Sequence, residues 1–333
     1  MGSVVQVQTD AQIVGLFTPL FQTFENASAT GTRSPLLAHY TSIRVMENIL
    51  LSSEVWFSNP LFMNDMQELV HGLSEGTKFF SDIGPLKKAG GSDERAEILR
   101  HSYFHYLQHF DMQQAFDTYV FCLTEHDPKN NDGLLSMWRG YGQHGNGAAL
   151  VFDSSKITLV PSSPLIFGKV SYVSNEERAA QVQALMNAWV ELTESLSLAN
   201  DKLHLAAHIA FSLVKGHALM TKHWGFSEEQ EWRVIYYPER DAEGALKQFL
   251  SYHIGERGVE PKLKYQIGHI ANVSAPDLAL ERLLDRIILG PSLSSPLALR
   301  SVQRMLDGIG KPNFKPLLRP STIPLRPNSG SSF

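Results

Sequence analysis

The chain has 333 residues, of which 43% are hydrophobic and 19% are charged, and its formal net charge is −5. A chain of this size and composition buries one large core or two medium ones, which excludes a disordered polypeptide. The charge lacks the basic surplus of a general nucleic-acid binder and favours a small-molecule partner. Cys122 is the one cysteine, so a disulfide framework and a thiolate metal site are excluded, and a reducing, cytoplasmic compartment is expected.

No stretch reaches the roughly 18 apolar residues that a membrane span requires. The N-terminus also lacks the basic start and long apolar run of a secretory signal. We therefore expect no membrane partner.

The first elements predict a packing helix and then a strand, a helix and a strand. Apolar residues recur at helical spacing over 11–26. The segment 36–40 predicts a strand, and Thr41 or Ser42 is placed to cap the helix that follows it. The segment 55–60 predicts a second strand, which proline ends.

The rest of the chain predicts helices around a central sheet. Helical segments are expected over 66–117, 175–222 and 296–307. The first has breaks at Gly84-Pro85 and Gly90-Gly91, and the second is expected to consist of two helices. Strands are expected at 118–123, 148–152, 166–172, 231–237, 286–289 and 314–318. This order predicts an α+β protein with a central mixed or antiparallel sheet.

Three segments follow from this pattern. We expect residues 1–35 to form an N-terminal helix and loop, and residues 327–333 to form an extended tail. We expect residues 36–326 to form a single catalytic-like α+β domain with a helical insertion at about 175–222 that covers the sheet and is a candidate surface for a protein partner.

Several familiar cofactor motifs are missing. The sequence contains no GxGxxG after a strand, no GxxxxGK[ST] and no HExxH, which disfavours a dinucleotide Rossmann domain, a P-loop and a zincin. Glycines cluster between 140 and 147, but their spacing favours a mobile turn before a strand.

Histidines recur at helical spacing in two places. His101, His105 and His109 lie every four residues, and His204 and His208 form a second pair. Two such side chains can bind a metal ion, but no carboxylate is interleaved on that face, so we interpret these stripes as solvated or half-buried and expect no metal.

Polar and aromatic residues converge near His39. They are His39 and Tyr40 in the first strand, Ser58 and Asn59 at the end of the second, and then Asn64, Asp65 and Glu68. Polar groups clustered at strand ends indicate a ligand pocket. The alternative is that Asn59, Asn64 and Asp65 cap the helix near Met66, while Trp56 and Phe57 belong to the core.

A second cluster, 228–233, precedes the apolar strand. A carboxylate such as Glu231, held by Arg233 and flanked by an aromatic ring, can stabilise a developing cation or orient a ribose hydroxyl. The alternative is a solvated acidic turn with a surface Glu231–Arg233 pair that contributes little stability.

These segments together resemble the bacterial family named domain of unknown function 2971. The resemblance rests on the His39–Ser42 start, the 56–60 segment with Asn64-Asp65 and Glu68, Ser136-Met137-Trp138 with Tyr141 and Gly147, Glu231-Trp232-Arg233, and 321–326. It spans about residues 36–326 and implies no established function.

The layout is also similar to that of ADP-ribosyltransferases of the His-Tyr-Glu type. The resemblance implies a split sheet, NAD as the substrate and no metal. It implies that His39 binds the adenosine-side ribose of NAD and that Tyr40 and Phe57 stack on nicotinamide. Phe57 is a departure from the family, in which this position is usually a tyrosine. The same resemblance implies that Ser58 supports the pocket and that Glu231 is the catalytic carboxylate, with Glu229 as a paired acid that selects the acceptor.

We further expect Asn64, Trp138 and Tyr141 to contact the cofactor, and Arg139 or Arg233 to hold its pyrophosphate. The first hypothesis is an NAD-consuming ADP-ribosyltransferase, which modifies a protein or nucleic-acid acceptor, or an NAD glycohydrolase. The resemblance implies a toxin or phage-defence effector. The second hypothesis is a non-catalytic nucleotide- or protein-sensing module.

Overall fold

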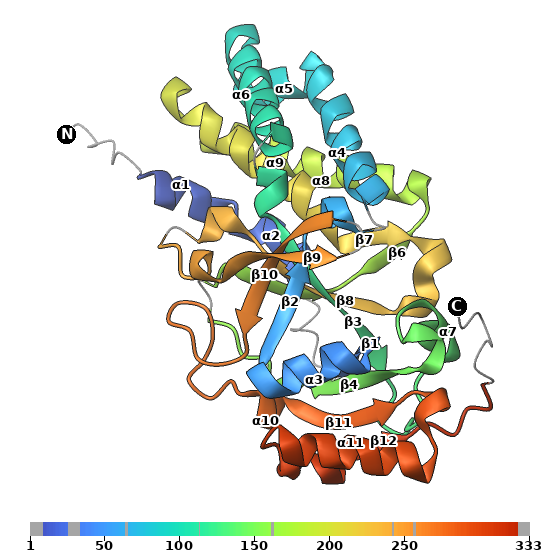
Figure 1. Cartoon of the computed structure of the whole chain (residues 1–333). Coiled ribbons are helices and arrows are strands. Elements are labelled where there is room, and N and C mark those ends of the chain that lie inside the picture. Colours follow the sequence, from blue (N-terminus) through green and yellow to red (C-terminus); the bar gives the residue numbers. More distant parts are fainter. Residues whose placement is uncertain are drawn as a thin grey trace. The chain divides into compact units, whose positions relative to one another are not determined.

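The computed structural model divides the chain into two compact units (Figure 1). It describes residues 9–25, 34–63, 66–112, 114–160, 163–241, 243–255 and 258–325. The helical unit comprises Met1–Thr30, Pro60–Asp117 and Val170–Phe226, and the sheet unit comprises Gly31–Asn59, Thr118–Lys169 and Ser227–Phe333. The helices at 175–222 therefore share a unit with the helices at 66–112.

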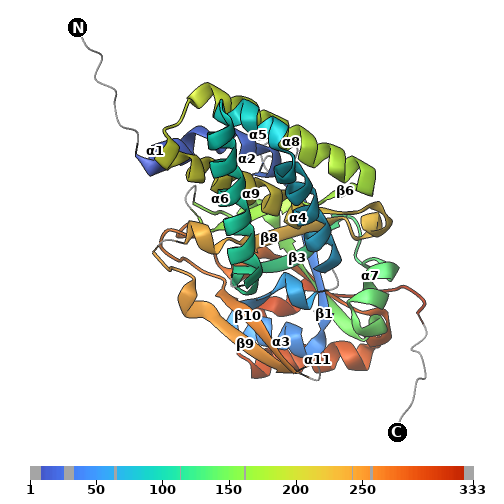
Figure 2. The same cartoon turned by 90° about the horizontal axis from the view of Figure 1, so that it is seen from above.

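The helical unit is built around one buried helix. Its elements are α1 (Asp10–Leu16), α2 (Thr18–Glu25), α4 (Met66–Ser81), α5 (Ile83–Gly90), α6 (Asp93–Met112), α8 (Asn175–Leu196) and α9 (Leu203–Met220), with the parallel pair β6 (Ser171–Val173) and β7 (Thr221–His223). Helix α9 is apolar on nearly all sides because α4, α6 and α8 pack against it (Figure 2). The predicted pair of helices within 175–222 is confirmed.

The predicted helix breaks are confirmed with a small shift. Asp82 caps α5 through the backbone N–H of Gly84, so the first break precedes Gly84-Pro85. Gly91 ends α5 with a φ of 81°, a conformation that glycine adopts without steric cost.

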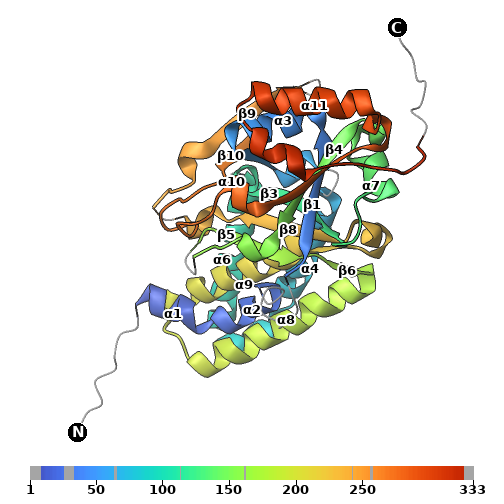
Figure 3. The same ribbon diagram turned by 90° about the horizontal axis from the view of Figure 1, so that it is seen from below.

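The sheet unit contains a ten-stranded sheet within the described residues. Its strands are β1 (Leu36–Ser42), β2 (Glu54–Ser58), β3 (Tyr119–His126), β4 (Gly147–Asp153), β5 (Leu165–Lys169), β8 (Glu231–Tyr236), β9 (Leu250–Gly255), β10 (Gly258–Gln266), β11 (Leu284–Leu289) and β12 (Leu318–Pro320). The β11–β12 pair is parallel and the other pairs are antiparallel. Figure 3 shows β4, β1, β3 and β8 of this sheet from below. The predicted α+β class with a mixed sheet is confirmed.

The helices of the sheet unit are α3 (Ile43–Ser52), α7 (Leu135–Gly140), α10 (Leu280–Leu283) and α11 (Pro296–Gly308). Ser42 caps α3 by accepting a hydrogen bond from the backbone N–H of Val45, as one of the two predicted caps.

Three segments differ from the sequence-based expectation. The strand expected over 166–172 is divided between β5 and β6, which belong to different units. The strand expected over 314–318 is largely a 3₁₀ turn, Pro312–Leu317, because its prolines cannot donate to a strand ladder. The hairpin of β9 and β10 was not predicted, since its polar residues weaken the alternating pattern.

Strand β3 carries two different strands on one of its edges. Strand β8 pairs with β3 from Tyr119 to Thr124 along the other edge. On the shared edge β1 pairs with 124–126, whereas β2 meets β3 at Val120. Because α3 links β1 to β2, the two strands and the helix enclose a gap, which we call the fork.

The glycine cluster forms a packed turn at the start of β4. A Cβ atom on Gly147 would lie 2.1 Å from the backbone oxygen of Thr41, the residue before its β1 partner Ser42, whereas a Cβ on Gly140 would meet nothing within 4 Å. The close approach of two backbones, rather than mobility, explains the glycine at 147.

We predict that Gly147→Ala destabilises the protein by about 1–3 kcal/mol, because the methyl group must displace the β1 backbone. Gly140→Ala is the matched control and should change the free energy of unfolding by less than about 1 kcal/mol. Urea denaturation followed by circular dichroism measures both. Equal stability of the two variants would contradict the close approach.

Candidate functional site

His39 lies in the fork and bonds to the stretch of the β3 edge between the pairings with β1 and β2. Its Nδ1 lies 3.1 Å from the backbone oxygen of Cys122, which is located between the β1 and β2 pairings. A carbonyl oxygen only accepts hydrogen bonds, so Nδ1 carries the hydrogen in the neutral ring. The remaining nitrogen, Nε2, is then an acceptor.

The surroundings of His39 keep its ring neutral. The ring packs against Phe121, with centroids 4.6 Å apart. Burial lowers the pKa of His39 below its ordinary value of 6.5, and the hydrogen bond to Cys122 offsets part of this effect. A neutral imidazole with one free acceptor nitrogen suits a ligand hydroxyl.

The fork opens into a cavity of about 280 Å³. Its lining comes from β1, α3 and β2: His39, Val45, Asn48, Ile49, Leu51, Ser52, Glu54 and Trp56. The cavity therefore combines an aromatic ring, a carboxylate, an amide and a hydroxyl with apolar side chains, which is the composition of a small-molecule site. We call it the fork cavity.

Alternation along β2 decides which side chains reach the fork cavity. Glu54 and Trp56 line it, whereas Val55 and Phe57 line a different, apolar cavity, because successive strand residues point to opposite faces. The Trp56 Nε1 donates a hydrogen bond to the Glu54 carboxylate at 2.5 Å, and the ring is 38% exposed.

Sequence reasoning placed the pocket near His39 but missed Glu54 and Trp56 as lining residues. The period-two pattern of Glu54–Ser58 contained the signal, since it separates Trp56 from Phe57. Phe57, expected to stack on nicotinamide, is 2% exposed and packs on Phe121 and Tyr265. This packing favours the alternative that Phe57 belongs to the core.

Ser58 and Asn59 tie the end of β2 to its neighbours. The Ser58 hydroxyl accepts a hydrogen bond from Lys262 Nζ at 2.9 Å. The buried Asn59 amide donates to the backbone oxygen of Thr118 at 3.0 Å. Neither residue lines the fork cavity. Asn64 lies outside the described residues.

Tyr40 and Trp138 form part of a buried cluster. Their rings meet edge to face with centroids 4.9 Å apart, and Trp138 is fully buried. The Tyr40 hydroxyl accepts from the backbone N–H of Leu134, and burial raises the pKa of Tyr40 to about 12. Trp138 Nε1 donates to the backbone oxygen of Asp132. Their predicted cofactor contacts stay predictions, since these bonds describe a structural role.

The Asp132 loop also explains the C-terminal motif. The hydroxyl of Ser321 donates to the Asp132 backbone oxygen, and the hydroxyl of Thr322 donates to its carboxylate at 2.9 Å. Ile323 packs against the Tyr40–Trp138 cluster. The segment that follows β12 is thereby fastened to the sheet unit.

Glu231 and Arg233 form a buried ion pair. The guanidinium Nε and Nη2 donate to the two carboxylate oxygens, each at 2.9 Å, and the side chains are 6% and 3% exposed. The alternative of a surface pair is therefore wrong. A bidentate pair uses both oxygens of the carboxylate and the matching face of the guanidinium.

Two further predicted residues lie on the surface of the sheet unit. Tyr141 is exposed, and its hydroxyl donates to the Glu229 carboxylate at 2.7 Å. Arg139 is exposed at the end of α7. Neither lines the fork cavity.

Two kinds of feature are absent from the described ranges. No group of three or more histidine, cysteine, aspartate or glutamate side chains is placed there to hold a metal ion. None of the helices in these ranges is both long and apolar enough to cross a membrane.

Comparison with curated proteins and with solved structures gives no match. The likeness to ADP-ribosyltransferases therefore stays a prediction. One family model does match, and its segment contains Trp138, Glu231 and Arg233 but not His39 or Trp56. Residues 137–234 match the family described as protein of unknown function (DUF2971), the family that the sequence motifs predicted, over a shorter segment than the expected 36–326.

Proposed function

We propose that the fork cavity binds NAD and that the protein consumes it, as an ADP-ribosyltransferase or an NAD glycohydrolase. The observation that carries the proposal is the pairing of a neutral His39, with its acceptor Nε2, and the exposed ring of Trp56 in one cavity. An aromatic face and an acceptor for a sugar hydroxyl are what a nucleoside requires.

In this proposal each fork residue has a separate task. Trp56 stacks on a base or on the nicotinamide ring, and His39 Nε2 accepts a hydrogen bond from a ribose hydroxyl. Asn48 and Ser52 of α3 supply polar groups at the rim of the cavity. The direction of each bond follows from the tautomer that Cys122 selects.

Cleavage of the nicotinamide glycosidic bond leaves positive charge on the ribose, which a nearby carboxylate stabilises. Glu54 supplies a carboxylate in the fork cavity, and the Trp56 hydrogen bond holds it there. Glu231 is engaged with Arg233 through both oxygens. We therefore propose that the Glu54 carboxylate faces the ribose. The resemblance to ADP-ribosyltransferases assigns this role to Glu231 instead.

A second candidate is a non-catalytic module that senses a nucleotide. The buried Glu231–Arg233 pair favours it, because a carboxylate held by arginine is poorly placed to stabilise a second cation. Such a module binds NAD without releasing nicotinamide. A role as a toxin or a phage-defence effector belongs to the catalytic proposal, since NAD depletion arrests a cell.

Incubation of the purified protein with NAD, with and without cell lysate as a source of acceptor, tests the catalytic proposal through free nicotinamide. We expect release that Glu54→Gln lowers by about 100-fold or more, because the amide removes the charge that faces the ribose. Glu47→Gln is the matched control, since Glu47 lies on α3 but does not line the cavity.

Glu231→Gln separates the two carboxylates. Removal of one partner from a buried pair should destabilise the protein by about 3 kcal/mol in urea denaturation, because Arg233 then loses the negative charge that its Nε and Nη2 contact. A variant that instead keeps full stability and loses all release would assign the chemistry to Glu231. Saturable NAD binding without release in any preparation would support the sensing module.

The pH dependence of NAD binding tests the state of His39. Because burial lowers the pKa of His39, Nε2 stays an acceptor below pH 6.5, and the NAD dissociation constant should be constant from pH 8 to below that value. Affinity should fall once the pH passes the lowered pKa. Isothermal titration with His39→Gln as the control measures this, and a loss of affinity centred at 6.5 or above would contradict it.

The lowered pKa of His39 also determines how the stability of the protein changes with pH. The unfolded chain binds a proton on His39 at a higher pH than the folded chain, so the stability lost through His39 appears as pH falls below about 6.5. His126 and His217 also have lowered pKa values and add the same sign. The difference between wild type and His39→Gln isolates the contribution of His39.

A further inference from the structure

The fork cavity contains a negative charge and no positive charge. Among its described lining residues, Glu54 is the one carboxylate, and none is a lysine or an arginine. His39 adds no charge, because burial lowers its pKa and keeps the ring neutral. The other lining side chains are an amide, a hydroxyl, an indole and aliphatic groups. The cavity therefore favours a ligand group of positive charge.

No basic side chain balances the charge of Glu54. Its Oε1 accepts the hydrogen bond from Trp56 Nε1, and within the described residues Glu54 forms no ion pair. Glu125 on β3, by contrast, pairs with Lys169 at 2.6 Å. An indole N–H is a neutral donor, so its hydrogen bond leaves the full negative charge on the carboxylate. Glu54 is thus available to a cationic ligand without breaking an ion pair.

The indole ring beside this carboxylate already attracts one cation. Lys264, the partner of Trp56 on β10, places its Nζ 4.6 Å from the centroid of the indole ring. Lys264 does not line the fork cavity, so a ligand can still contact the part of the ring that does. The quadrupole of an indole attracts a cation over its face, and the attraction grows when the pair is shielded from water. Trp56 and Glu54 therefore favour the same charge.

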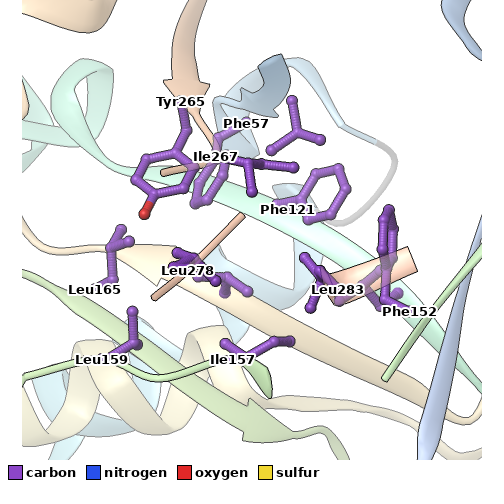
Figure 4. A pocket seen from close by; sticks show the side chains of 13 residues that line it. Phe57, Phe121, Phe152, Ile157, Leu159, Leu165, Tyr265, Ile267, Leu278 and Leu283 are labelled. Atoms are coloured by element: carbon purple, nitrogen blue, oxygen red, sulfur yellow. The ribbon is translucent and has the colours of Figure 1, made fainter. Parts of the chain in front are cut away.

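The opposite face of β2 lacks these features. Val55 and Phe57 line a second cavity of about 60 Å³ there, which we call the apolar cavity. Its other lining residues are aliphatic or aromatic, among them Phe121, Phe152 and Leu278 (Figure 4). A cation that entered the apolar cavity would lose its hydration without gaining a counterion. Binding of a cation next to β2 is therefore expected in the fork cavity.

The size of the fork cavity limits how much of a dinucleotide it can hold. Its volume of about 280 Å³ lies just below the range of about 300–1,000 Å³ that is typical of sites for drug-sized ligands. NAD contains two ring systems, two riboses and a pyrophosphate, so one end of it fits. The pyrophosphate is an anion and is repelled by Glu54. Of the two ring systems, adenine is neutral, whereas the oxidised nicotinamide is a pyridinium cation.

We propose that the fork cavity binds the nicotinamide end of NAD by its positive charge and therefore discriminates NAD from NADH. The inference rests on the proposed function and extends it by naming the end that is bound. Trp56 stacks on the pyridinium ring, and Glu54 supplies the opposite charge beside the ring and the ribose. NADH carries a neutral nicotinamide ring, so it gains neither attraction. The ligand class of the cavity is an N-alkylated pyridinium ring.

Two pairs of ligands test the role of the charge in the full chain by isothermal titration. Nicotinamide is neutral, whereas nicotinamide methylated on the ring nitrogen is a cation that has no glycosidic bond to cleave. NADH is compared with carba-NAD, in which a methylene group replaces the ribose ring oxygen and prevents cleavage. In each pair the cationic ligand should bind at least about tenfold more tightly. These measurements use the wild type and need no variant to fold.

Glu54→Gln isolates the charge, because glutamine keeps an oxygen that can accept the Trp56 hydrogen bond. In this variant the two members of each pair should bind with affinities within about twofold of each other. Glu47→Gln is the matched control, since Glu47 lies on α3 and does not line the cavity. It should keep the preference of the wild type.

Equal affinity of the wild type for nicotinamide and its ring-methylated cation would overturn the proposal, as would a preference that Glu54→Gln preserves. Failure of the cation to bind at millimolar concentration would overturn it too. Free nicotinamide released from NAD is measured separately. Release without a preference for the cation leaves the proposed function standing and removes this inference. A preference without release supports the inference and makes NAD a ligand that the protein binds without cleaving.

Discussion

The sheet unit depends on a single constraint, which is that one edge of β3 serves two strands. Strand β1 pairs with residues 124–126 and β2 meets β3 at Val120, so the edge at Cys122 lies between them. The hydrogen bond from His39 Nδ1 to the Cys122 oxygen bridges this gap with a side chain. The same bond fixes the histidine tautomer, and burial keeps the ring neutral, so the geometry of the sheet and the chemistry of the fork have a common origin.

Strand β2 then separates two environments. Its alternating residues give Glu54 and Trp56 to the fork cavity and Val55 and Phe57 to the apolar cavity. A shift of one residue in its pairing with β10 would exchange these sets and bury a carboxylate among leucines, so the register is strongly specified. The two cavities differ in chemistry because they lie on opposite faces of one strand, and Phe121 is the side chain that contacts both the apolar cavity and His39.

The sequence predicted what depends on local pattern. The helices 43–52, 175–196 and 296–308 and the strands near 36, 119 and 231 all followed from periodicity and caps. It did not predict which aromatic ring lies in the fork, because this depends on the register of β2. It did not predict the burial of the Glu231–Arg233 pair either, since strands on both sides of β8 cover it and both are distant in sequence.

The difference in burial between Glu231 and Glu54 indicates which role each carboxylate can have. Breaking a buried arginine–carboxylate pair is costly, so a residue that must change its contacts during a reaction is poorly placed within one. Glu231 lies in such a pair in a strand whose residues are all buried, and there it satisfies Arg233. Glu54 lies at the start of a strand, in a cavity, beside a tryptophan N–H and a neutral histidine. Within one sheet, the deeper carboxylate thus suits stability and the shallower one suits contact with a ligand.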